Sequence, residues 1–182
     1  MSVFTNPASG TGEDGGRYVA AVLGLLGDQD PLVVLGATVR WCRDNVAGLT
    51  PAQLETPEGP GKWSIGEVLQ HLADSELVWG HRLRRVLAED RPPLIGYDQD
   101  LWARRLGYRQ AESGQAIRLF SALRQANLHL LERAEDQDLD RVGIHAERGP
   151  ESLRHMIRLY AGHDLLHRKQ ITRIRESIGG SE

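Results

Sequence analysis

The chain has 182 residues, 40% of them hydrophobic, and a formal net charge of −3. This length and apolar content predict one domain with a well-buried core and leave little room for a second. Lysine and arginine are scattered among aspartate and glutamate, which excludes the concentrated basic patch of a nucleic-acid-binding protein.

Cysteine content and apolar runs restrict the cellular setting. Cys42 is the only cysteine, so no intramolecular disulfide can form and nothing indicates an oxidising compartment. The N-terminus has no basic start followed by an apolar core, and the longest apolar run, Val19 to Leu26, is far too short to span a bilayer. We therefore expect a soluble, cytoplasmic protein with no membrane partner.

The glycine-rich N-terminal segment, residues 1–16, is predicted to be a flexible tail, because it cannot bury enough apolar surface to offset its ordering. Residues 17–178 are predicted to form the single domain. A short helix over Arg17–Leu26 is expected to end at Gly27.

The first long helix is predicted to begin with Asp30 as its N-cap and Pro31 at its first position, where the missing proline N–H has no consequence. It is expected to end between Gly48 and Pro51. Its apolar residues recur every three or four positions and predict a core-facing stripe of Leu32, Leu35, Val39, Cys42, Val46 and Leu49.

A second long helix is expected from Ile65 to Glu89, after a connection rich in proline and glycine over residues 51–62. Ser64 followed three residues later by Glu67 is a capping box, in which each side chain binds a free backbone N–H at the start of the helix. His71 lies on or beside the apolar stripe of this helix.

Residues 90–110 contain two prolines and two glycines and cannot form one uninterrupted helix. Their length and their aromatic residues indicate a crossover lying over one end of the domain. A third helix, Ser113–Ala134, carries Asn127 on its apolar stripe. This amide is either a surface group at the edge of the stripe or a buried group in a polar cavity.

The last helix is predicted to begin with Pro150 at its first position, after a polar turn that contains His145, and to end at Glu176. No strand pattern is visible. Four amphipathic helices with one long crossover connection therefore predict an all-α four-helix bundle, a fold that builds metal sites between facing helices.

Two histidines of the last helix, His163 and His167, are four residues apart and project from one face, so both imidazoles can reach a single cation. With seven histidines in 182 residues, such a pair arises by chance about one time in four. His71 is the candidate third ligand. The height of His71 along the bundle, counted from the start of its helix, does not match the height of the pair, whether the two helices are parallel or antiparallel. Spacing alone therefore does not establish the triad.

Two segments carry a resemblance to a known family. Residues 61–76 (GKWSIGEVLQHLADSE) and 160–167 (YAGHDLLH) are similar to the motifs of the DinB-like superfamily of metal-binding four-helix bundles, and the resemblance covers about residues 28–176. It implies that His71, His163 and His167 bind a divalent metal such as zinc or nickel, with water completing the coordination. All three positions of the family pattern are present.

Such a site has an open position, as catalytic metal sites do. Asp74 is a candidate to accept the second ring N–H of a ligating histidine; the alternatives are a solvated acid on the helix surface and a salt bridge within the bundle. Asp164 lies about 100° from the histidine face and is not expected at the metal. Asp74 and Asn127 are the only candidate catalytic residues. Candidates for contact with a substrate are Asn127, Tyr97, Trp102 and Tyr108, with His145 at the pocket rim.

The resemblance also implies a function: transfer of a low-molecular-weight thiol, such as bacillithiol or mycothiol, to a small-molecule electrophile. A metal-dependent hydrolase is one alternative and a non-catalytic metal-binding or ligand-binding bundle is another. Apolar residues outside the inward stripes are compatible with a homodimer.

Overall fold

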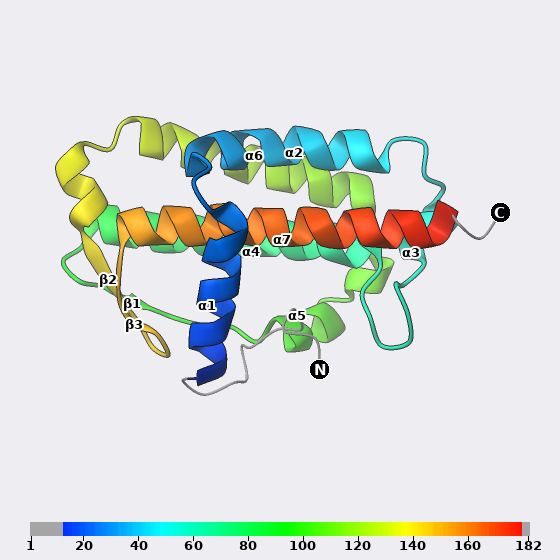
Figure 1. Cartoon of the computed structure of the whole chain (residues 1–182), viewed down its shortest axis with the longest axis horizontal. Coiled ribbons are helices and arrows are strands. Elements are labelled where there is room, and N and C mark those ends of the chain that lie inside the picture. Colours follow the sequence, from blue (N-terminus) through cyan, green and yellow to red (C-terminus); the bar gives the residue numbers. More distant parts are fainter. Residues whose placement is uncertain (1–12, 180–182) are drawn as a thin grey trace.

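The computed structural model describes residues 13–179, so most of the predicted tail, residues 1–12, lies outside the described residues. The long helices lie side by side and form the predicted four-helix bundle (Figure 1). They are α2 (Pro31–Val46), α4 (Ile65–Ala88), α6 (Ser113–Glu132) and α7 (Leu153–Gly179).

The topology of the bundle follows from the directions of these helices. Helices α2 and α7 run one way, and α4 and α6 run the other way (Figure 1). The tightest packing is between α4 and α6 and between α2 and α7, and contacts of α2 with α6 and of α4 with α7 close the ring. Because α4 and α6 are parallel neighbours, the chain must return along the bundle between them. This return is the predicted long crossover connection.

The crossover was predicted to lie over one end of the bundle, and this prediction was wrong. It pairs a short strand, β1 (Pro93–Leu94), into a small sheet and then runs back beside α4 through α5 (Gln99–Arg105) and the 3-10 turn η1 (Tyr108–Gln110). Its aromatic residues hold it there, since Tyr108 is buried and its hydroxyl donates to Asp74 Oδ2 at 2.6 Å. The crossover therefore covers the side of α4 that carries His71.

The prediction that no strand exists was wrong. Strand β2 (Val142–His145) pairs parallel to β1 and antiparallel to β3 (Gly149–Ser152). Pro150 is thus a strand residue, and α7 begins at Leu153 rather than at Pro150. Strands of two to four residues are too short to show an alternating pattern, so tertiary pairing is what defines them. A further 3-10 helix, η2 (Asp136–Asp140), precedes β2.

The predicted helix caps are confirmed at two positions. Asp30 accepts hydrogen bonds from the N–H groups of the first turn of α2, and Ser64 and Glu67 form the capping box of α4. A short helix not predicted from the sequence, α3 (Pro51–Glu55), has its own capping box between Thr50 and Gln53.

The core-facing stripe of α2 differs from the prediction at its start. Leu32 is 44% exposed, whereas Val34, Leu35, Thr38, Val39 and Cys42 are buried.

Among residues 13–179, no single helix is both long and apolar enough to cross a membrane. Gly15–Leu26 and Pro31–Val46 meet these criteria of length and composition only as a pair, and the pair is bent by 85°.

Helix α1 (Glu13–Leu26) begins four residues before the predicted start at Arg17, so the predicted tail boundary at residue 16 was wrong for residues 13–16. It lies across α7 (Figure 1), and Val22 and Leu25 pack with Leu159 and Leu166 of that helix. This packing outweighs the poor helix propensity of the glycines in its first turns.

The crossing of α1 over α7 requires a glycine at position 162. A Cβ added at Gly162 would lie 2.2 Å from the carbonyl oxygen of Val22, which is far inside van der Waals contact. Gly162 therefore lets the backbone of α1 rest directly on α7, one residue before His163.

We predict that Gly162→Ala destabilises the protein by about 2 kcal/mol, because α1 must move away from α7. Urea unfolding measures the loss. Gly36→Ala is the matched control: Gly36 is exposed in the middle of α2 with nothing near its Cβ position, so alanine should stabilise by about 0.5–1 kcal/mol. Equal effects of the two substitutions would contradict the close crossing.

Candidate metal centre

The three histidines singled out from the sequence meet in the middle of the bundle. The Nε2 atom of His163 lies 3.2 Å from Nε2 of His71 and 3.1 Å from Nε2 of His167. His71 comes from α4 and the other two from α7. All three residues have the spacing and donor atoms of a group that could hold a metal ion.

Unequal helix ends explain how His71 reaches the α7 pair. The two helices are antiparallel (Figure 1). His71 lies seven residues after Ser64, and His167 lies twelve before the end of α7 at Gly179. At 1.5 Å per residue, α7 must extend past the start of α4 by about 8 Å for the imidazoles to meet. That offset is set by tertiary packing.

Burial keeps the three imidazoles neutral. It lowers the pKa of His71 and His163 well below the ordinary value, and the nearby His167 lowers the pKa of both further. Burial also lowers the pKa of His167 to about 4, against a hydrogen bond to Gln170 that raises it. Neutral imidazoles are the form that binds transition metals.

The hydrogen bonds around His167 determine which of its nitrogens is free. Its Nδ1 lies 2.9 Å from Oε1 of Gln170, an atom that only accepts, so Nδ1 carries the proton and Nε2 keeps a lone pair. With the same tautomer at His71 and His163, three Nε2 lone pairs converge at these distances, and they repel unless a cation lies among them. With metal–nitrogen distances of about 2.0–2.1 Å, tetrahedral zinc sets its nitrogens about 3.3 Å apart, close to the spacing seen. The donor set therefore fits a divalent metal.

Hydroxyl groups adjoin the cluster on the α4 side. The Oγ atom of Ser75 lies 3.2 Å from Nε2 of His71 and 2.8 Å from the hydroxyl of Tyr97. Tyr97 in turn packs on the ring of Trp102. The crossover thus brings Tyr97, a predicted substrate-contact candidate, next to the histidines.

Asp74 and Asn127 have other partners than those predicted. Asp74 accepts hydrogen bonds from Tyr108 and Gln70 and makes none with the histidines. Asn127 is buried, so the surface alternative was wrong; its amide donates to Oε1 of Glu76 at 2.7 Å. Neither residue forms a hydrogen bond with the histidine cluster.

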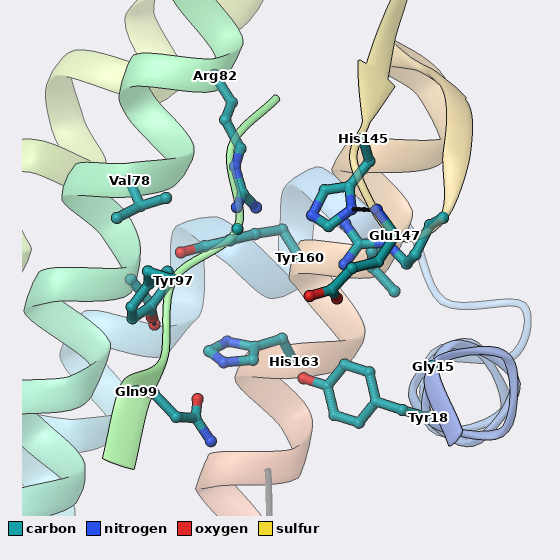
Figure 2. A pocket seen from close by; sticks show the side chains of 14 residues that line it. Gly15, Tyr18, Val78, Arg82, Tyr97, Gln99, His145, Glu147, Tyr160 and His163 are labelled. Carbon is teal, nitrogen blue, oxygen red and sulfur yellow. Dashed lines mark hydrogen bonds between the residues drawn. The ribbon is translucent and has the colours of Figure 1, made fainter. Parts of the chain in front are cut away.

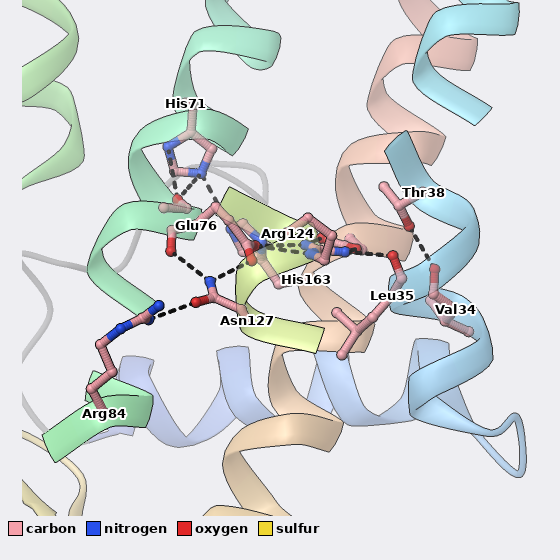
Figure 3. Close-up of polar contacts among 11 residues, drawn as sticks. Val34, Leu35, Thr38, His71, Glu76, Arg84, Arg124, Asn127 and His163 are labelled. Carbon is pink, nitrogen blue, oxygen red and sulfur yellow. Dashed lines mark hydrogen bonds and ion pairs between the residues drawn. The ribbon is translucent and has the colours of Figure 1, made fainter. Parts of the chain in front are cut away.

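Arg124 is the central residue that the sequence reasoning missed. It is buried on the core face of α6, and Figure 3 shows its guanidinium between the helices. Its Nε and Nη2 donate to Oε2 of Glu76 at 3.0 and 2.8 Å, and its Nη1 donates to Oδ2 of Asp164 at 2.6 Å. The same Nη1 donates to the carbonyl oxygen of Leu35. The sequence indicated a buried role for Arg124 through its position on the same apolar helix face as Phe120 and Leu131.

This ion cluster, which we define as Arg124, Glu76 and Asp164 with Asn127, joins all four bundle helices near the histidines. Glu76 is five residues after His71 on α4, and Asp164 directly follows His163 on α7. Burial raises the pKa of Glu76, while Arg124 holds it down. The cluster sets the height of α4 against α7 and so the meeting of the histidines.

Two cavities reach the histidine cluster from different sides. One, which we call the inner cavity, has a volume of about 130 Å³ and is lined by His163, Ser75, Tyr97 and His145 among others (Figure 2). The other, the outer cavity, has a volume of about 620 Å³ and is lined by His167 and Gln170. Gln99 lines both. The histidines are therefore accessible from two compartments.

The remaining histidines lie away from the centre, except one. His81 and His129 are exposed and His155 is half-buried. His145 is buried at the end of β2 and lines the inner cavity, in agreement with the position at the pocket rim suggested for it.

Comparisons with known proteins place this geometry in context. A sequence model described as the DinB superfamily matches residues 42–171. A protein of Oceanobacillus iheyensis, named as an inferred metal-dependent hydrolase, is 31% identical over 133 residues, which cover 73% of this chain and 77% of that protein. A protein of Geobacillus thermodenitrificans with the same kind of name is 29% identical over 181 residues, 98% of this chain and 94% of that protein.

A solved structure is also similar. YfiT from Bacillus subtilis, described as a probable metal-dependent hydrolase with an unusual four-helix bundle topology, aligns with a TM-score of 0.77 and 27% identity. The alignment covers 82% of this chain and 86% of that one.

We predict that Arg124→Met destabilises the protein by about 3–5 kcal/mol, because it leaves two buried carboxylates without their cation. Urea unfolding measures the change. Arg118→Met is the matched control on the same helix: Arg118 is exposed and pairs with Glu112 at 3.1 Å, so its loss should be below about 1 kcal/mol. A similar small loss for both variants would show that the ion cluster does not hold the bundle together.

We predict that the metal-free protein loses stability as the pH falls from 7 to 5. The unfolded chain protonates His167 below its ordinary pKa of 6.5, whereas the folded chain, with a pKa of about 4, stays neutral, so acid favours unfolding. Protonation of this residue in the unfolded chain alone lowers the free energy of unfolding by roughly 2 kcal/mol between pH 7 and pH 5. Urea unfolding of chelated protein at both pH values measures the loss, which should be smaller in His167→Asn. Equal losses would contradict a neutral His167.

Proposed function

The chain belongs to the DinB superfamily, and on that premise we propose that it is a metal-dependent hydrolase whose divalent cation is bound by His71, His163 and His167. The observation that carries the proposal is the convergence of three buried, neutral imidazole nitrogens in the bundle core. The names of the relatives support the reaction class.

Three protein ligands leave one coordination position open, and a divalent cation in such a site polarises a substrate carbonyl and lowers the pKa of bound water. Imidazole ligands suit zinc or nickel. Gln170 holds the ring of His167 in the tautomer that presents Nε2. The hydroxyls of Ser75 and Tyr97, beside His71, supply polar groups next to the centre that can orient a substrate.

Transfer of a low-molecular-weight thiol is the second candidate function, and one observation favours it. No carboxylate of residues 13–179 forms a hydrogen bond with the three histidines, so hydrolysis has no carboxylate general base in contact with the cluster. A thiol ionises far more readily than water and depends less on such a base. The inner and outer cavities would give a thiol and an electrophile separate approaches.

We predict that His71→Ala and His163→Ala each abolish metal binding while leaving helicity nearly unchanged, because the bundle has an extensive apolar core of its own. Elemental analysis by mass spectrometry should find about one zinc or nickel per wild-type chain and none in either variant. His129→Ala, at an exposed site on α6, should keep full occupancy. Full occupancy in either cluster variant would refute the triad.

The same metal-loaded protein separates the two reaction classes. Hydrolysis of ester and amide panels without added thiol supports the hydrolase. Activity that appears only when a small thiol and an electrophile are both present supports the transferase. In either case His163→Ala should remove the activity, and activity that survives in this variant would contradict a role for the site.

A further inference from the structure

The inner cavity contains a positive charge with no counter-ion. Figure 2 shows Arg82 of α4 reaching into the cavity above Tyr160, while Tyr18 of α1 and His163 of α7 approach it from other sides. The Nε of Arg82 is buried and has no hydrogen-bond partner, and its Nη2 donates only to the carbonyl oxygen of Ile95. No carboxylate among residues 13–179 lies within ion-pair distance of it.

Two other charged residues, Arg148 and Glu147, line this cavity, and neither forms an ion pair with Arg82. Arg148 forms a two-point ion pair with Glu151, with Nη2 donating to Oε2 at 3.0 Å. Glu147 is exposed to solvent at the cavity lining. Burial lowers the pKa of Arg82 and the nearby charge of Arg148 lowers it further, yet a guanidinium stays protonated at neutral pH. Arg82 is thus a half-buried cation whose buried Nε has no hydrogen-bond partner and which has no ion-pair partner among residues 13–179.

A neutral donor lies beside this cation and also lacks a partner. The hydroxyl of Tyr160 is buried and makes no hydrogen bond in the described part of the chain. Its ring is held between Trp79, at a centroid distance of 4.5 Å, and His163, at 5.4 Å, so the hydroxyl has a fixed position. Buried polar groups are almost always paired, and two unpaired ones lining the same cavity indicate a ligand that accepts hydrogen bonds.

We propose that the inner cavity binds an oxyanion group of the substrate, a carboxylate or a phosphate, through Arg82 and the hydroxyl of Tyr160. Its assignment to a substrate rests on the proposed function, because His163 joins the cavity to the metal centre. A cavity of about 130 Å³ holds the acid group and a few carbon atoms. The substrate class is therefore a small acid whose reacting bond lies a few atoms from its charged end.

The test measures binding of two probes, succinate and inorganic phosphate, by isothermal titration calorimetry. Wild-type protein is titrated in zinc-loaded and chelated forms, because the chelated form excludes anion binding to the metal itself. We expect at least one probe to bind both forms, and Arg82→Gln to weaken it at least tenfold. The probe that binds more tightly identifies carboxylate or phosphate. Absence of binding, or equal binding by Arg82→Gln, overturns the proposal.

Two further variants control for charge and folding. Arg85→Gln removes the same charge from the same helix at a site paired with Glu89 outside the cavity, and it should bind the probes as wild type does. Arg82→Lys keeps the charge and should retain most of the binding. Weakening by Arg85→Gln equal to that by Arg82→Gln would mean that overall charge, not this cavity, binds the anion.

Measuring the zinc content distinguishes failure of the oxyanion site from failure of the proposed metal-dependent function. Arg82→Gln should keep one zinc per chain and wild-type circular dichroism. Zinc binding without anion binding that depends on Arg82 overturns the oxyanion site and leaves the metal centre intact. Binding that depends on Arg82 in a protein that takes up no zinc supports the oxyanion site and overturns the metal-dependent function.

Discussion

The structure depends on one buried arginine between two buried carboxylates. Arg124 is 2% exposed, and Glu76 and Asp164 are fully buried, so none of these charges can be satisfied by water. Each finds its partner across a helix boundary, and the observed relative placement of α4, α6 and α7 provides all of these hydrogen bonds. Because Asp164 directly follows His163 on α7, the same placement positions the candidate metal ligands.

The direction of the helices determines what surrounds the centre. Since α4 and α6 are parallel neighbours, the chain must cross the length of the bundle between them, and this crossover brings Tyr97 and Tyr108 beside α4 (Figure 1). The small sheet contributes His145, and α1 rests on Gly162 to close the remaining side. Segments that are distant in the sequence thus enclose a cavity that the four-helix core alone would leave open.

The site combines neutral imidazoles with a positively charged guanidinium. The histidine cluster is neutral because burial disfavours charge on its imidazoles, which suits them to share a cation. Arg82, on the helix that carries His71, is a cation that no carboxylate in residues 13–179 neutralises. The proposed metal centre and the proposed oxyanion site therefore adjoin through His163, an arrangement suited to holding one end of a small acid while its other end reacts.

Local features were predictable from the sequence because they depend on residues close together in the chain. The Asp30 cap, the Ser64–Glu67 capping box and the shared face of His163 and His167 follow from backbone geometry within one or two turns. The four-helix class followed from the amphipathic pattern of four segments. The triad with His71 was inferred through the family motifs, since spacing alone left the heights of the histidines unmatched. The short strands, the path of the crossover, the buried state of Asn127 and the role of Arg124 required the tertiary structure. Each of these depends on groups that meet across helix boundaries, where the free energy of pairing a buried charge or hydrogen bond outweighs any local preference of the chain.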